Sequence, residues 1–350
     1  MRKVTLEVLA EELQVSKSLV SKVLNGRKVG VSDAVKERIL AAAERYSYSP
    51  NRMAVSLADQ KTKIIGCIIP NVYFDYFSEL SYWIERCARE QGYNVLMCNA
   101  GENDALELEY LKLYQTSIVD GMIVLPSDDH SNLGVYKAMK RNGFPYVFLD
   151  RYVHGVSASL VSTDHKEAFY YLTKLLIAKG HRRIVYIGHN LSTASTVQTE
   201  RYLGYARAMV EVGGEEQSIN IMSDIDIDNH LLALVMSLPA DKRPTALVMI
   251  SSQDIRPILR ICKKNGFTIP GDLEIASVDE LKIPFTTEED LELSRVVREP
   301  MIIIRQQPEV LARETVELLI HQIDDGDMKA VTKLIPAIHN GAIIAPECAE

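Results

Sequence analysis

Continuous apolar runs alternate with segments of helical period between residues 64 and 278, and this alternation constrains the fold more than any other feature. The apolar runs are 64–70, 93–98, 121–126, 146–150, 184–188, 245–250 and 273–278. The segments with the length and period of helices are 78–91, 105–115, 133–141, 166–178, 200–212 and 253–264. Continuous apolar strands separated by helices are typical of parallel sheets that are covered on both faces. Because the pattern restarts at residue 166, it predicts a body of two doubly wound α/β lobes.

The length and the polar residues set further limits. A chain of 350 residues is too long for one ordinary core and indicates two or three domains. The apolar runs are far too short to cross a bilayer, and Glu7, Glu11 and Glu12 interrupt any signal-peptide run. We therefore expect a cytoplasmic protein with no membrane partner. The five cysteines show no metal-ligand spacing, so we expect neither a metal ion nor a cofactor.

Charge is distributed unevenly along the chain. Residues 1–60 hold ten lysines and arginines against seven acidic residues, a net charge of +3, while the whole chain carries −8, which leaves −11 for the remainder. A small basic head on an acidic body fits a DNA-binding domain attached to a domain with another task.

The first fifty residues contain three short segments of helical period, which predict an all-α head. Thr5, Ser16 and Ser32 precede them, and serine and threonine are favoured N-cap residues. Two short helices joined by a tight turn, with a third packed across them, form a helix-turn-helix. The same periodicity also fits a three-helix mini-domain with a solvated polar face.

In a helix-turn-helix the second helix, here from Lys17 to about Asn25, lies in the major groove. Its first turn carries Lys17, which can donate to guanine, and Ser18, which can bond either kind of base edge. The other head residues that we expect at the DNA are Thr5, Ser16, Ser21, Lys22 and Asn25.

Residues 15–25, 31–33 and 48–58 resemble the head of the lactose/galactose repressor family. The body resembles the same family, and periplasmic sugar-binding proteins in fold. The matching stretches of the body are 77–80, 120–123, 149–151, 180–188, 200–205 and 304–306. The resemblance implies an N-terminal helix-turn-helix head and a periplasmic-binding-protein-like body of two doubly wound parallel-sheet lobes.

The resemblance also implies a hinge helix or linker over residues 51–62. In the family this segment pairs across a dimer and enters the minor groove. Leu57 matches the side chain that wedges between base pairs, and Ala54 lies beside it. Asn51 and Arg52 are expected phosphate contacts. A plain linker with one anchoring leucine is the alternative.

Three domains follow from these features. Residues 1–50 form the DNA-binding domain, 51–62 the hinge, and 63–345 the effector-binding and dimerisation domain. Within this last domain we expect an N-terminal lobe of about 63–163 and 293–327, and a C-terminal lobe of about 164–290 and 330–345.

Polar and aromatic residues gather at the expected carboxyl ends of the strands, where doubly wound folds bind ligands. The expected effector-binding residues are Phe74, Asp75, Tyr76, Phe77, Asp150, Asp164, Arg201, Ser251, Ser252 and Asp279. Aromatic rings, carboxylates and a guanidinium suit a sugar, and a nucleobase could use the same groups. In the family, the position of Arg201 holds ligand hydroxyls, while those of Asp164 and Asp279 line the pocket.

We therefore expect a sequence-specific transcription regulator, a repressor of a carbohydrate-utilisation operon. It would bind palindromic operator DNA as a homodimer and respond to a sugar or sugar derivative. A nucleobase-responsive regulator and a catabolite-control-type regulator with a phosphorylated carrier protein as co-effector are the alternatives. No catalytic motif is present, so we do not expect an enzyme.

Three departures from the family pattern stand out. Gln14 occupies the turn where the family has glycine, which would cost about 1 kcal/mol if its φ is positive. Ser251 and Ser252 replace an Asn-Asp pair, and residues 285–301 do not match the usual lobe crossover. The last two departures put the family's usual effectors in doubt.

Overall fold

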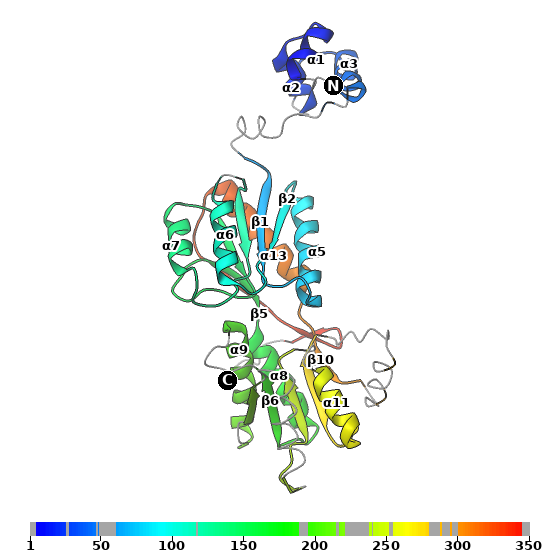
Figure 1. Cartoon of the computed structure of the whole chain (residues 1–350), viewed down its shortest axis with the longest axis vertical. Helices are drawn as coiled ribbons and strands as arrows, with labels where there is room; N and C mark the ends of the chain where they lie inside the picture. Colours follow the sequence, from blue (N-terminus) through cyan, green and yellow to red (C-terminus); the bar gives the residue numbers. More distant parts are fainter. Residues whose placement is uncertain are drawn as a thin grey trace. The chain divides into compact units, whose positions relative to one another are not determined.

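The computed structural model describes residues 5–25, 28–46, 48, 61–116, 118–188, 195–214, 217–220, 238–239, 241–251, 255–279, 288, 295 and 300–344. The chain divides into two compact units, residues 1–63 and 64–350 (Figure 1). Five expected site residues lie outside the described residues: Asn51, Arg52, Ala54, Leu57 and Ser252. Among the described residues, no helix is both long and apolar enough to cross a membrane.

The first unit is the predicted all-α head. It contains α1 (Leu6–Leu13), α2 (Lys17–Leu24) and α3 (Asp33–Arg45). One apolar side chain from each helix is almost fully buried where the three meet: Leu9, Val20 and Ile39. Burying a side chain of this size contributes about 1.5–3 kcal/mol. This shared core fixes the angle between α1 and α2, and so confirms the helix-turn-helix arrangement.

Side-chain caps begin the first two helices. The Thr5 hydroxyl accepts a hydrogen bond from the Val8 amide at 3.4 Å, and the Ser16 hydroxyl accepts one from the Leu19 amide at 3.1 Å. The turn between the helices contains Gln14, whose φ of 53° lies in the left-handed region. A side chain there is strained, because its Cβ approaches the backbone.

Replacing Gln14 by glycine is expected to raise the free energy of unfolding of the head by about 1 kcal/mol, since glycine adopts positive φ without that clash. Urea unfolding of the full chain, followed by a probe in the head, measures the change. A matched Gln115→Gly substitution, just after a body helix and with φ of −68°, should destabilise the body instead. Equal effects at both positions would contradict the strain at Gln14.

The second unit begins with a six-stranded parallel sheet, which defines the N-lobe. Its strands lie in the order β11-β5-β4-β3-β1-β2. Their bounds are β1 Ile64–Ile69, β2 Asn94–Asn99, β3 Gly121–Val124, β4 Tyr146–Leu149, β5 Ser159–Thr163 and β11 Thr332–Ile335. Helices α5 (Asp75–Glu90) and α13 (Pro308–Asp325) pack on one face, and α6 (Asp104–Tyr114) and α7 (Leu133–Arg141) on the other (Figure 1).

A five-stranded parallel sheet defines the C-lobe, with the order β10-β9-β8-β6-β7. Its bounds are β6 Ile184–Gly188, β7 Gln217–Asn220, β8 Ala246–Met249, β9 Glu274–Val278 and β10 Ile302–Ile304. Helices α8 (His165–Ala178) and α9 (Thr196–Glu211) cover one face, and α11 (Ile255–Asn265) the other. A short antiparallel pair, β12 (Ile338–His339) and β13 (Ala342–Ile343), completes the lobe. Two doubly wound lobes were predicted, and the sheets confirm them.

The helices α8 and α9 approach each other closely because Gly204 lies between them. A Cβ atom on Gly204 would sit 2.2 Å from the carbonyl oxygen of Lys166 and 2.8 Å from the amide of Tyr170. Both are backbone atoms and cannot move aside easily. This contact therefore sets the position of α9 relative to the start of α8.

The division between the lobes differs from the predicted one at two segments. Strand β10 lies in the predicted N-lobe segment 293–327 but pairs with β9 in the C-lobe. Strand β11 lies in the predicted C-lobe segment 330–345 but pairs with β5 in the N-lobe. Neither strand could be found from an apolar run, because β10 has three residues and β11 is an edge strand whose residues alternate between exposed and half-buried. The chain therefore crosses between the lobes three times, near residues 164, 306 and 336.

Candidate effector cleft and DNA-reading surface

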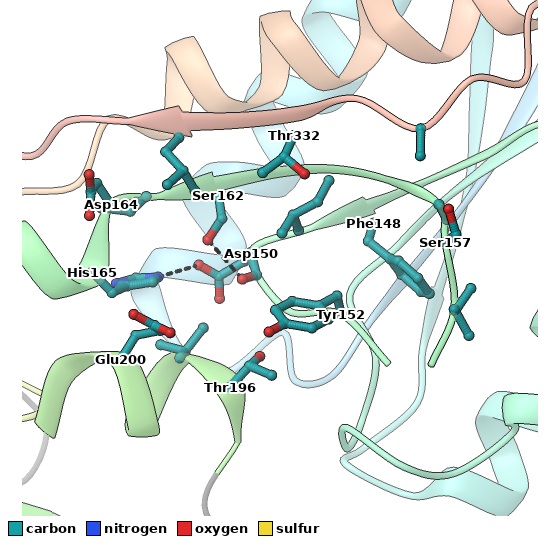
Figure 2. Close-up of a pocket in the computed structure, with 17 residues that line it drawn as sticks. Phe148, Asp150, Tyr152, Ser157, Ser162, Asp164, His165, Thr196, Glu200 and Thr332 are labelled. Atoms are coloured by element: carbon teal, nitrogen blue, oxygen red, sulfur yellow. Dashed lines mark hydrogen bonds and ion pairs between the residues drawn. The ribbon is translucent and has the colours of Figure 1, made fainter. Parts of the chain in front are cut away.

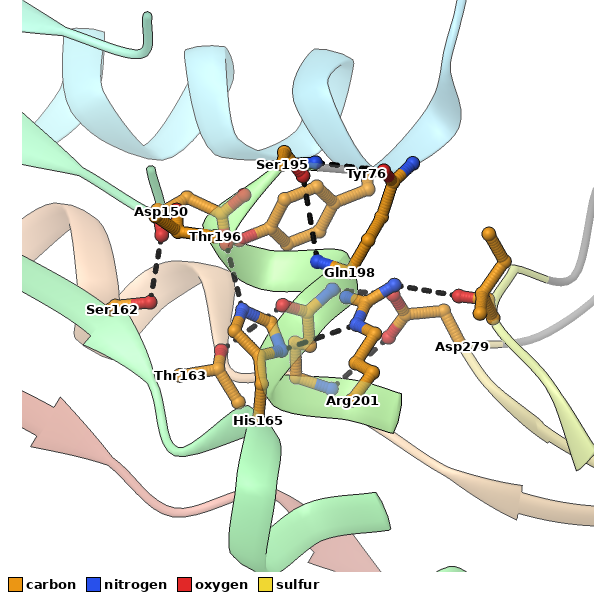
Figure 3. Close-up of polar contacts among 12 residues, drawn as sticks. Tyr76, Asp150, Ser162, Thr163, His165, Ser195, Thr196, Gln198, Arg201 and Asp279 are labelled. Atoms are coloured by element: carbon orange, nitrogen blue, oxygen red, sulfur yellow. Dashed lines mark hydrogen bonds and ion pairs between the residues drawn. The ribbon is translucent and has the colours of Figure 1, made fainter. Parts of the chain in front are cut away.

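Four side chains from both lobes form one hydrogen-bonded network at the carboxyl ends of the strands (Figure 3). Asp150 follows β4, and its Oδ1 accepts a hydrogen bond from the Tyr76 hydroxyl of α5 at 3.2 Å. The same oxygen lies 3.2 Å from Nε2 of His165, the first residue of α8. Arg201 of α9 donates from Nε to Nδ1 of His165 at 3.3 Å. The N-lobe and the C-lobe are thus joined through a buried imidazole.

The two contacts of His165 determine its protonation. The Arg201 Nε–H group can only donate, so the Nδ1 atom of His165 must accept and carries no proton. The proton therefore lies on Nε2, which donates to Asp150. Burial and the Arg201 charge lower the pKa of His165 and outweigh the attraction of Asp150. The imidazole is neutral at pH 7.

Asp150 is held as a carboxylate. It is 5% exposed, and burial alone would raise its pKa. The hydrogen bond from His165 and the charges of Arg151 and Arg201 outweigh burial, so the pKa of Asp150 lies below its ordinary value. Burial, with the charges of Asp150 and Asp279, raises the pKa of Tyr76 well above 10, so its phenol stays a hydrogen-bond donor.

A second cluster lies where the chain crosses between the lobes. Asp279 follows β9 with a φ of 60° and accepts hydrogen bonds from the Gln306 amide at 3.0 Å and side chain at 2.8 Å. Thr163, at the end of β5, donates to the Gln306 side-chain oxygen at 3.0 Å. Asp279 therefore lies at a fixed position on the C-lobe side of the crossover.

Arg201 supplies the positive charge of the site. Its Nη1 donates to the carbonyl oxygen of Ile250 at 2.6 Å, and its guanidinium lies 5.4 Å from the centre of the Phe169 ring. These contacts and the bond to His165 hold the group in one orientation. The guanidinium has further N–H groups, which can donate to a ligand.

The stability of the body is expected to fall as the pH drops below about 6.5, the ordinary value for histidine. Because the folded-state pKa of His165 is lowered, the unfolded chain binds a proton in this range that the folded chain does not. Stability is then lost with a slope of up to about 1.4 kcal/mol per pH unit, until the pH reaches the folded-state pKa. Urea unfolding of the wild type and of His165→Gln between about pH 5 and about pH 7.5 measures this. An equal slope in both proteins would contradict the neutral imidazole of His165. Burial also lowers the pKa of His181, and this residue contributes equally to the slope of both proteins.

The other predicted effector residues have different surroundings. Phe74 is half-buried at the N-cap of α5, Asp75 is exposed, and Phe77 is 6% exposed in the N-lobe core. The Asp164 carboxylate caps α8 by accepting from the Glu167 amide at 3.1 Å. Ser251 is half-buried just after β8. Of the ten predicted residues, the structure brings Tyr76, Asp150, Arg201 and Asp279 together.

Sequence reasoning missed His165, Thr163 and Gln306. A single histidine after a helix-capping aspartate gives little signal, because the partner that makes it important, Arg201, is far away in the chain. Thr163 lies in β5, whose sequence Ser-Leu-Val-Ser-Thr has no continuous apolar run. Gln306 was part of a family-like stretch, and that stretch was the available signal.

Seven of the predicted DNA-binding residues lie in the part of the head that the structure describes. Lys17 and Ser18 are exposed on the first turn of α2. The Lys17 ammonium group forms an ion pair with Glu7 of α1. The Asn25 side chain donates to the Ser21 carbonyl at 2.8 Å, which orders this side of the helix, and Lys22 is exposed. The hydroxyl groups of Thr5 and Ser16 serve as the caps described above.

Both units match families of known proteins. Residues 5–51 match the family described as bacterial regulatory proteins, lacI family, and residues 62–337 match periplasmic binding proteins and sugar binding domain of LacI family. The ribose operon repressor of Haemophilus influenzae is 28% identical, covering 91% of this chain and 92% of its own length. Catabolite control protein A of Priestia megaterium is 27% identical, covering 91% and 96%. A crystal structure of the lac repressor dimer bound to operator and the anti-inducer ONPF has a TM-score of 0.78 and 21% identity, covering 96% and 97%.

Proposed function

Because the chain belongs to the LacI family, whose members are transcription regulators rather than enzymes, we propose that it is a cytoplasmic homodimeric repressor switched by a neutral sugar or polyol. The head binds a palindromic operator, with Lys17 and Ser18 at base edges. In the hinge, Leu57 with Ala54 beside it enters the minor groove, and Asn51 and Arg52 contact phosphates.

The observation that carries the effector class is the inter-lobe network. It combines the Asp150 carboxylate, the guanidinium of Arg201 and neutral donors and acceptors, and the second cluster adds the Asp279 carboxylate beside it. Sugar hydroxyls donate to carboxylates and accept from guanidinium groups in this kind of setting. A phosphate group is disfavoured, because the charge of Arg201 is opposed by two nearby carboxylates. A ribose operon repressor among the relatives agrees with a sugar.

The mechanism acts through lobe closure. The bond between His165 and Asp150 and the 3.5 Å bond from Thr196 to Asp129 both join the two lobes. A ligand that adds hydrogen bonds to both sides stabilises one degree of closure over another. The N-lobes of the dimer then shift, and the hinge segments either pair on the DNA or separate.

The catabolite-control alternative remains open because a catabolite control protein is a relative. A phosphorylated carrier needs unpaired cations on the docking surface. On the N-lobe helices α5 and α13, the arginines are already paired: Arg86 with Glu90, Arg89 with Glu85, and Arg313 with Glu309 and Glu90. Because these arginines already have acidic partners, we place the regulatory site in the cleft and not on this surface.

A thermal-shift screen tests the proposal. The full-length protein is heated with monosaccharides, polyols, sugar phosphates, sugar acids and nucleobases. A ligand that binds the folded state stabilises it by mass action and so raises the Tm. At a ligand concentration 100 times the Kd, the free energy of unfolding increases by about 2.7 kcal/mol. We expect a neutral sugar or polyol to raise the Tm. A shift with nucleobases alone, or with sugar phosphates alone, would contradict the proposed class.

Replacing Lys17 by alanine is expected to weaken binding to the selected operator by about 1–3 kcal/mol, or about ten- to hundredfold, because a base contact is lost. The operator is first selected from a randomised duplex library with the full-length protein, and Kd is then measured by fluorescence anisotropy. Lys36→Ala removes the same charge from α3 and is the matched control. A loss that is equal on operator and unrelated DNA would show that Lys17 contributes only charge.

A further inference from the structure

A pocket of about 460 Å³ lies beside the effector cleft, on the face of the N-lobe sheet that α6 and α7 cover (Figure 2). Phe148 and Leu160 of β4 and β5, together with Leu334 of β11, form its apolar wall. Asp150 and His165 belong both to the pocket lining and to the inter-lobe network, whereas Tyr76, Arg201 and Asp279 do not line the pocket, which therefore adjoins the network on one side. Its volume is within the range of about 300–1,000 Å³ that holds small ligands.

The polar wall of this pocket is anionic. Asp150, Asp164 and Glu200 line it, and its described lining residues include no lysine or arginine. Two of these carboxylates already have donors, since Asp150 binds Tyr76 and His165 while Asp164 caps α8. Glu200 is half-buried and makes no hydrogen bond or ion pair with any residue that the structure describes. Its carboxylate is therefore available to a ligand, and the wall repels anions.

Tyr152 adds an aromatic surface. Its ring lies 5.3 Å from the ring of His154, and among the described residues its hydroxyl has no hydrogen-bond partner. Burial, with the charges of Glu200 and Asp129, raises the pKa of Tyr152, so its phenol stays neutral. The face of a neutral phenol attracts cations, and more strongly where water is excluded.

We propose that this pocket binds a small organic cation, a primary amine on an apolar body, as a second ligand in addition to the cleft effector. The ammonium group pairs with Glu200 and the body packs against Phe148, Tyr152 and Leu160. An amine satisfies the one unpartnered carboxylate, whereas a neutral ligand leaves it unpaired and an anion is repelled.

The position of the pocket gives this ligand a regulatory effect. Glu200 and Thr196 come from the C-lobe, while Phe148, Tyr152 and Leu334 come from the N-lobe. A ligand that contacts both lobes shifts their closure, and so couples to the cleft. By reciprocity, cleft effector and amine change each other's affinity by the same factor.

Isothermal titration calorimetry of the full-length protein tests the pocket with three probes of similar shape: phenethylamine, 2-phenylethanol and phenylacetate. We expect saturable binding of phenethylamine, at least about tenfold tighter than 2-phenylethanol, and no binding of phenylacetate. Equal affinity for the three probes, or no saturable binding of the amine, would overturn the proposal.

Four variants locate the binding. Glu200→Gln should remove the preference for the amine, and Leu334→Trp, at a 54% exposed position on the rim, should block entry. The matched control Glu85→Gln removes an exposed carboxylate from α5 and should change nothing. Arg207→Ala removes a cation from the outside of α9, away from the pocket lining, and should leave amine binding intact. The titrations contain no sugar, so this test does not depend on the cleft effector. Loss of amine binding in Arg207→Ala, or its survival unchanged in Glu200→Gln, would place the probe elsewhere and overturn the proposal.

Discussion

Arg201→Ala is expected to weaken effector binding by about a hundredfold or more, the largest effect of any cleft substitution. A hydrogen bond to a charged group contributes about 1.5–3 kcal/mol, and the guanidinium can donate more than one to a sugar. The loss also leaves the Nδ1 atom of His165 and the carbonyl oxygen of Ile250 without their donor. Calorimetry with the sugar found in the thermal-shift screen measures the change in Kd.

Two controls separate recognition from folding in this experiment. Arg207→Ala removes an arginine two turns further along α9, where it pairs with Glu167 on the outside of the helix, and should leave the effector Kd unchanged. Operator binding by Arg201→Ala without effector is measured as well, because it shows that the head, a compact unit of its own, is still folded in this variant. An unchanged effector Kd in Arg201→Ala would remove Arg201 from the site.

Gly204→Ala is expected to destabilise the body by about 3 kcal/mol or more, because the new methyl group overlaps backbone atoms of α8. For a unit of this size the Tm should fall by about 5–10 °C. The displaced α9 also carries Arg201 away from His165, so effector affinity should fall in the folded fraction. Differential scanning calorimetry and effector titration measure the two effects.

Gly134→Ala is the matched control for this substitution. Gly134 lies in the first turn of α7, and a Cβ atom there meets nothing within 4 Å. Alanine favours the helix, so the body should be stabilised by up to about 1 kcal/mol. If Gly204→Ala did not lower the free energy of unfolding relative to Gly134→Ala, the close approach of α8 and α9 would be contradicted.

The sequence predicted those parts of the fold whose signal is local. The long apolar runs of β1, β3 and β6 and the capped helices of the head were found because neighbouring residues carry the pattern. Strands β5, β10 and β11 were not found, because their pairing partners lie elsewhere in the chain and their own sequences are short or alternating. The lobe division depends on these strands, so it was predicted incorrectly at two segments.

The site residues also differ in whether they could be predicted from the sequence. Arg201 and Asp279 could be named because the family resemblance points to them. His165 could not, since its role comes from Arg201 of α9 on one side and Asp150 of the N-lobe on the other, and these residues meet only in the folded body. Phe77 was expected at the site with its neighbours Phe74 and Tyr76, but its side chain is buried in the N-lobe core, where its ring packs against the rings of both neighbours.

We expect a ligand in the cleft to control the binding of the head to DNA. The most direct test of this coupling is the operator Kd of the full-length protein with and without a saturating concentration of the sugar found in the screen. We expect the Kd to change by about 5- to 150-fold, the usual range of allosteric coupling, and Arg201→Ala to remove the change at the same sugar concentration. An operator Kd that is the same with and without bound sugar would contradict the account.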